Sequence, residues 1–151
     1  MIYEIKQDGK FKYIEEGNGE PLLLLHGLFG ALSNFAHLIE YFNKSYKVVV
    51  PMLPLLDLDL LHTSVGGLQK FVHKFIENRN YTSINLLGNS LGGHVALVHI
   101  LKHPERIKSL TLTGSSGLFE SGMGDTYPKR GDKEYIRNKT ALTFYDPAIA
   151  T

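Results

Sequence analysis

The sequence predicts an α/β fold: a three-layer αβα sandwich in which helices cover both faces of a mostly parallel sheet. Two observations predict it. Residues 22–25 form a short, continuous apolar run, as in a strand that is buried on both faces of a parallel sheet, and the apolar-rich runs at residues 48–50, 84–87 and 110–113 are predicted to be further strands of that sheet. Helical patterns separate these runs, and each crossover of roughly 20 to 30 residues suits a right-handed βαβ unit.

A β-hairpin is expected before the first of these strands. Residues 3–6 and 10–14 alternate apolar and polar side chains, and Asp8-Gly9 lies between them. Because only one face of such a hairpin is apolar, we place it at one edge of the sheet.

Three helices are expected between the strands. The first two have apolar residues at i, i+3, i+4 and i+7 over residues 35–42 and 68–76. Their N-cap candidates are Ser33 or Asn34 for the first helix, and Thr63 or Ser64 for the second. The third helix, over residues 95–101, is apolar nearly all round, so we expect it to be buried. His103-Pro104 should end it.

The composition excludes several classes of protein. The 151 residues include 16 Lys and Arg against 15 Asp and Glu, and this net charge of +1 predicts no binding to nucleic acid or to an anionic membrane. The absence of cysteine excludes disulfides and cysteine-ligated metal. We expect no cofactor and no metal, since neither a Gly-x-Gly-x-x-Gly nor a Walker sequence occurs. Without a bilayer-length apolar stretch or a signal peptide, the expected location is cytoplasmic.

The strongest chemical signal is Gly88-Asn89-Ser90-Leu91-Gly92, which lies directly between a predicted strand and a predicted helix. A strand that reverses into a helix over so few residues lifts the serine hydroxyl clear of the sheet, so Ser90 is the predicted nucleophile. Gly88 and Gly92 are expected because a Cβ at either position would collide across the turn. The N–H of Leu91, at the start of the helix, is a candidate to stabilise a developing oxyanion.

A second loop, which begins at His26-Gly27, follows the strand predicted over residues 22–25. Ligands in open α/β sheets bind beyond the carboxyl ends of the strands, and both loops leave such ends. The second loop can bring the N–H of Leu28, or of its neighbour Phe29, opposite the Leu91 N–H, so that two donors bracket a carbonyl oxygen. For the His26 side chain we expect a structural role, as a core histidine bonded to backbone.

These motifs resemble the N-terminal half of the α/β-hydrolase superfamily over about residues 3–118. The stretch from His103 to Leu112 and the Gly114-Ser-Ser-Gly117 loop are similar to that family as well. The resemblance implies that Ser90 is the nucleophile, with Leu91 and either Leu28 or Phe29 as oxyanion residues. It also implies that strand 84–87 lies between strands 22–25 and 110–113. Hydrolases that cleave carbon–carbon bonds share the Gly-Asn-Ser-Leu-Gly-Gly pattern with many ordinary esterases, so the pattern is weak evidence for the substrate.

The chain departs from the family pattern in two places. The loop at residues 51–62 has no glycine where family members usually have Asp-x-x-Gly-x-Gly-x-Ser. The family's acid and histidine follow on later strands, and this chain ends before either strand. We therefore expect residues 1–118 to be the N-terminal part of the core and residues 119–151 to begin a lid or cap. A missing C-terminal portion would then supply the acid and the histidine, and the fragment alone should be inactive.

The histidines within the chain offer one weak alternative base. This is His62, which lies near Asp57 and Asp59 in a loop that leaves the carboxyl end of a strand. The other histidines are assigned to the helix that leads away from Ser90 (His94, His99 and His103), to solvated outer faces of helices (His37 and His73) and to the oxyanion loop (His26). We predict that no histidine lies within hydrogen-bond reach of Ser90 Oγ.

Two functions from different classes fit these observations. One is a serine hydrolase that cleaves an ester or a related acyl bond, including a carbon–carbon bond, in a small apolar molecule with water as the second substrate. The other is a non-catalytic, hydrolase-like half-domain that serves as a binding or assembly module. Reactivity of Ser90 toward a fluorophosphonate distinguishes the two.

Overall fold

The computed structural model describes residues 3–28, 35–55, 64–118 and 134, and the structural statements below refer to these residues. The chain divides into a unit of Met1–Phe119 and a second unit of Glu120–Thr151. The expected lid or cap segment, residues 119–151, lies outside the described residues apart from the exposed Glu134.

A six-stranded sheet with the order β1-β2-β4-β3-β5-β6 forms the first unit. Its antiparallel part consists of β1 (Lys6–Asp8) and β2 (Phe11–Glu16), and β2 also pairs antiparallel with β4 (Tyr46–Pro51). The parallel part consists of β4, β3 (Glu20–Leu25), β5 (Ile84–Asn89) and β6 (Ile107–Thr113). The predicted parallel strands, the place of β5 between β3 and β6, and the hairpin at one edge are all confirmed.

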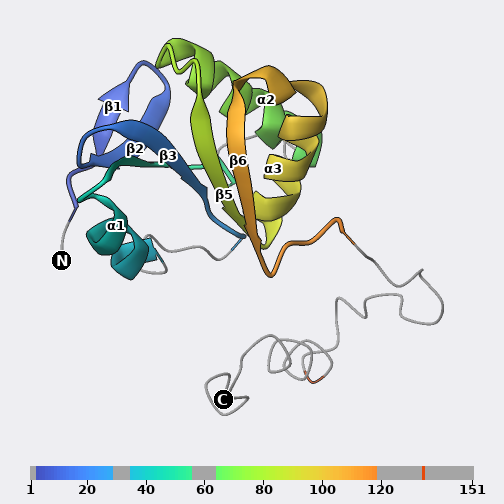
Figure 1. Ribbon diagram of the computed structural model, residues 1–151. Helices are drawn as coiled ribbons and strands as arrows, with labels where there is room; N and C mark the ends of the chain where they lie inside the picture. Colours follow the sequence, from blue (N-terminus) through green and yellow to red (C-terminus); the bar gives the residue numbers. More distant parts are fainter. Residues whose placement is uncertain (1–2, 29–34, 56–63, 119–133, 135–151) are drawn as a thin grey trace. The chain divides into compact units, whose positions relative to one another are not determined.

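Apolar strand residues alternate between two cores, one on each face of the sheet, which explains the continuous apolar runs. In β3, Leu22 and Leu24 pack in the core under α1 (Ala36–Phe42), whereas Leu23 and Leu25 pack in the core under two other helices. These are α2 (Val65–Asn78) and α3 (Leu91–Lys102), which cover the opposite face (Figure 1). The three-layer arrangement follows directly from this alternation.

The helix ends match the predicted signals in part. Ser64 caps α2, since its Oγ accepts a hydrogen bond from the Gly67 N–H at 3.1 Å. The candidate caps of α1, Ser33 and Asn34, lie outside the described residues. The third helix ends at Lys102, directly before His103-Pro104, as predicted.

The expectation that the third helix is buried all round is wrong for the described part of the chain. Val95, Ala96 and His99 on its inner face are buried, but Leu101 is 81% exposed. The apolar sequence alone does not reveal which side of this helix α2 and the sheet cover. No helix among residues 3–28, 35–55 and 64–118 is long and apolar enough to cross a membrane.

Candidate active site

The carboxyl ends of β3, β5 and β6 lie together at one edge of the sheet (Figure 1). Ser90 joins β5 to α3. The strand register places Gly88 beside Leu25 at the end of β3, and Asn89 beside Thr113 at the end of β6. The loop after β3 and the loop after β6 therefore flank the serine, which is where open α/β sheets bind ligands.

Ser90 has a strained backbone conformation. Its φ is 52° and its ψ is −119°, a region that L-residues rarely adopt, and its side chain is exposed. The N–H of Ser90 donates to Thr113 O at 3.1 Å, and its C=O accepts from the N–H groups of Gly93 at 3.0 Å and His94 at 3.2 Å. Strain of this kind, of order 1–3 kcal/mol, persists only where the surrounding structure holds the residue in place.

The glycines around Ser90 allow close backbone contacts. A Cβ on Gly88 would lie 2.6 Å from Gly92 O, and a Cβ on Gly92 would overlap the Leu25 carbonyl and lie 2.7 Å from His26 O. A Cβ on Gly93 would overlap the Ser115 side chain in the loop after β6. This third requirement was not predicted, although the doubled glycine at 92–93 is its signal in the sequence.

The loop after β3 lies against the serine and is fixed by His26. A Cβ on Gly27 would lie 3.0 Å from Ser90 Cβ and 3.5 Å from Ser90 Oγ. The Leu53 N–H donates to His26 Nε2 at 3.1 Å, so Nδ1 carries the ring proton and donates to Gly27 O at 2.9 Å. Because the Gly27–Leu28 peptide is trans and planar, fixing its C=O also fixes the direction of the Leu28 N–H.

The predicted oxyanion residues are only partly described. Leu91 is the first residue of α3, where an N–H has no acceptor one turn earlier in the helix. Leu28 follows Gly27 directly and its side chain is 58% exposed. Phe29, the alternative to Leu28, lies outside the described residues. The convergence of these N–H groups on one oxygen stays a prediction.

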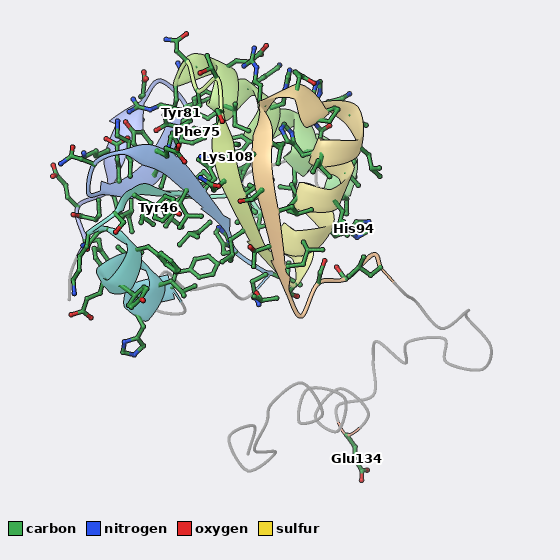
Figure 2. The ribbon with its side chains drawn as sticks, in the orientation of Figure 1. Tyr46, Phe75, Tyr81, His94, Lys108 and Glu134 are labelled. Atoms are coloured by element: carbon green, nitrogen blue, oxygen red, sulfur yellow. The ribbon has the colours of Figure 1, made fainter. Side chains whose placement is uncertain are left out.

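Among residues 3–28, 35–55 and 64–118, no histidine forms a hydrogen bond with Ser90 Oγ. His94 lies on the outer side of α3 (Figure 2), where its ring closely approaches Gly117. His37 is exposed on α1. His62, Asp57 and Asp59, which make up the alternative base and acid, lie outside the described residues.

Three other histidines gather where α2 and α3 pack together. His73 stacks on His103 with ring centroids 3.8 Å apart and planes 14° apart, and His99 lies 5.3 Å from His103 and 5.8 Å from His73. The expectation that His73 occupies a solvated outer face is therefore wrong. His73 lies beside the apolar stripe of α2, at the edge that packs against α3, so the ring is partly buried.

Burial makes His99 hard to protonate. Its side chain is 1% exposed, and Gln69 Nε2 donates to its Nδ1 at 3.3 Å because Lys102 occupies the Gln69 oxygen. The pKa of His99 is lowered from 6.5 to about 4, chiefly by burial and also by His103, His73 and Arg106, with Glu105 opposing them. The neutral ring is thus the form that fits between α2 and α3.

We predict that this histidine makes the fold sensitive to acid. Well above pH 6.5 the His99 ring is neutral in the folded and in the unfolded chain. As the pH falls from 6.5 to 4, the ring becomes protonated in the unfolded chain but stays mostly neutral in the folded chain. This difference in pKa lowers the free energy of unfolding by about 3 kcal/mol over that range. In urea unfolding between pH 4 and 7.5, H99Q should lose less stability toward acid than the parent. H37Q, which changes an exposed histidine, should follow the parent, and a parallel decline of all three proteins would contradict the prediction.

Within the described residues, no three His, Asp or Glu side chains come together as a metal-binding group. The expectation of no metal rested in part on the absence of a His-x-x-x-His pair, and that reason is wrong: His99 and His103 are four residues apart, a spacing that zinc sites on helices use. In the structure His103 is the C-cap residue of α3 and stacks on His73 instead.

Sequence and structure comparisons agree with this geometry. The sequence model of the family described as "alpha/beta hydrolase fold" matches residues 20–144. The chain is 31% identical over 140 residues to Lipase 1 of Psychrobacter immobilis, covering 88% of the chain and 43% of the lipase. It is 31% identical over 117 residues to 2-hydroxy-6-oxo-6-(2'-aminophenyl)hexa-2,4-dienoic acid hydrolase of Metapseudomonas resinovorans, covering 71% of the chain and 39% of that enzyme.

A solved structure extends the similarity to three dimensions. MGS-MChE2, an alpha/beta hydrolase enzyme from the metagenome of sediments of the Mar Chica lagoon in Morocco, is 40% identical with a TM-score of 0.74. The match covers 97% of this chain and 62% of that protein. The chain spans about two fifths of the length of the two curated relatives above.

Proposed function

The chain belongs to the alpha/beta hydrolase fold family, and from that premise we propose that Ser90 is the nucleophile of a serine hydrolase that cleaves an ester or a related acyl bond of a small apolar molecule. The observation that carries the proposal is the backbone of Ser90, with φ 52° and ψ −119°, at the turn from β5 into α3. Strain at a single exposed serine, beyond the carboxyl ends of parallel strands, marks a functional site rather than an ordinary turn.

In the proposed reaction, Ser90 Oγ attacks the carbonyl carbon of the substrate while a base takes the hydroxyl proton. The tetrahedral oxyanion accepts hydrogen bonds from the N–H groups of Leu91 and of Leu28 or Phe29. The base then passes its proton to the leaving alcohol, and water hydrolyses the acyl-serine. The position of Gly27 against Ser90 supports the loop after β3 as the second side of this oxyanion site. Two exposed leucines favour an apolar substrate because they lie near Ser90 in the structure. Leu28 follows Gly27, which lies against Ser90, and Leu118 lies two residues after Ser116, which is bonded to the Ser90 carbonyl.

The base and its acid are proposed to come from sequence C-terminal to residue 151, in keeping with the chain order of serine, acid and histidine in this family. The described histidines support this, since His26 uses both ring nitrogens on backbone groups and His94 lies beside Gly117. A pair formed by His62 with Asp57 or Asp59 is the alternative.

A fluorophosphonate tests the proposal, because it forms an Oγ–phosphorus bond with an activated serine and releases fluoride. We expect the full-length protein to be labelled on the peptide that contains Ser90, and residues 1–151 alone to be labelled at least about a hundredfold more slowly, for want of a base. Intact and peptide mass spectrometry measure both. Absence of label in the full-length protein would refute the nucleophile and favour a binding or assembly module. Equal labelling of residues 1–151 would place the base within the chain, and H62A would then abolish it.

A further inference from the structure

We propose that Asn89 is a positioning residue: its carboxamide, together with the segment after β6, holds the backbone of Ser90 in the reactive conformation. The inference rests on the proposed role of Ser90 as nucleophile and adds a residue that acts through it. Asn89 precedes Ser90 at the end of β5, and its side chain reaches Thr113 at the end of β6.

Hydrogen bonds from Asn89 and Ser90 converge on the carbonyl of Thr113. Asn89 Nδ2 donates to Thr113 O at 3.0 Å and to Thr113 Oγ1 at 3.1 Å. The backbone N–H of Ser90 donates to the same Thr113 O at 3.1 Å. The position of Thr113 therefore determines the direction of the Ser90 amide, and the Asn89 side chain determines the position of Thr113.

The other backbone group of Ser90 is bonded to the segment after β6 as well. Its carbonyl accepts hydrogen bonds from the Ser116 N–H at 3.3 Å and from Ser116 Oγ at 3.5 Å, besides those from the first turn of α3. Both polar groups of the Ser90 backbone are thus bonded to the segment from Thr113 to Ser116. A serine at positive φ relaxes toward negative φ unless such contacts hold it, and relaxation would move Oγ away from the attack position.

The chain supplies a matched control four residues earlier on the same strand. Asn85 lies on the same face of β5, where its Oδ1 accepts a hydrogen bond from Ser109 Oγ of β6 at 2.7 Å. Asn85 also bridges β5 and β6, but it lies five residues before Ser90 in the sequence. If both asparagines serve strand pairing alone, replacing either one should affect Ser90 equally. If Asn89 positions Ser90, replacing Asn89 should affect Ser90 more than replacing Asn85.

The experiment compares N89A, N85A and the isosteric N89D, which loses both N–H donors, in the full-length protein. Hydrogen exchange of the Ser90 amide and saturation kinetics of inactivation by a fluorophosphonate are the two measurements. N89A and N89D should speed exchange at Ser90 about tenfold and lower the maximal inactivation rate about tenfold, while half-saturating probe concentration stays unchanged. N85A should change each quantity less than about twofold.

Equal effects of N89A and N85A on the two measurements would overturn the proposal, as would unchanged exchange at Ser90 in both Asn89 variants. If the parent protein fails to react with the probe, the nucleophile is refuted, and the exchange comparison still decides whether Asn89 holds the Ser90 backbone. A T113V variant provides a further check. It removes only Oγ1, so it should slow inactivation less than N89A and add little when combined with it.

Discussion

Replacing Ser90 by alanine is expected to lower the turnover of a short-chain p-nitrophenyl ester by the full-length protein by about four powers of ten or more. The substitution removes the attacking oxygen but keeps Cβ and the backbone bonds to Thr113, Gly93 and His94. Fold and substrate binding should therefore survive, with an unchanged unfolding midpoint and substrate still bound. Steady-state kinetics and thermal unfolding measure the two properties.

The matched control for this substitution is S83A, which removes the hydroxyl of an exposed serine just before β5. It should retain the activity of the parent. Comparable turnover in S90A and S83A would show that the measured activity does not depend on the strained serine, and the proposed mechanism would then be wrong.

The second large effect is expected from Gly92→Ala, which should destabilise the fold by about 3 kcal/mol or more. The added methyl group would overlap the backbone carbonyl of Leu25 and approach His26 O to 2.7 Å, and neither backbone can yield without separating β3 from α3. For a domain of this size the loss corresponds to a midpoint lowered by about 10 °C in thermal unfolding.

Gly66→Ala is a closely matched control, because Gly66 and Gly92 are each the second residue of a helix. Among the residues that the structure describes, a Cβ on Gly66 meets Ser64 Oγ alone, at 3.8 Å. Alanine there should stabilise the protein by several tenths of a kcal/mol through its higher helix propensity. A similar midpoint in the two variants would mean that β3 and α3 are not in close contact at Gly92.

The sheet could be predicted because each strand carries its own signal. Residues 22–25 are apolar at every position, and the structure divides them between two cores on opposite faces. The exposure of Leu101 and the partial burial of His73 could not be predicted in this way. Both exposures depend on which part of the chain packs against the helix. His73 of α2, for example, is partly covered by His103, which lies at the C-terminal end of α3.

In the candidate site too, residues of a local motif could be predicted from the sequence, whereas residues brought together by strand pairing could not. Ser90, Gly88 and Gly92 form a contiguous motif whose spacing is dictated by one turn, so the sequence alone identifies them. Thr113 and Ser116 become neighbours of Ser90 only because β5 pairs with β6, and no local pattern in either segment indicates this. The same holds for the bond between Leu53 and His26, which joins the loops after β3 and β4.

The dependence of Ser90 on the segment after β6 sets an order of events during synthesis. Ser116, the last residue bonded to the Ser90 carbonyl, leaves the ribosome 26 residues later, which is about 1 to 5 s at ordinary elongation rates. Throughout that interval β3, β4 and β5 can assemble while the turn at Ser90 still lacks the contacts that impose its strain. We therefore expect the nascent chain to carry a relaxed serine until the sixth strand arrives, so that the reactive geometry is acquired after the surrounding sheet.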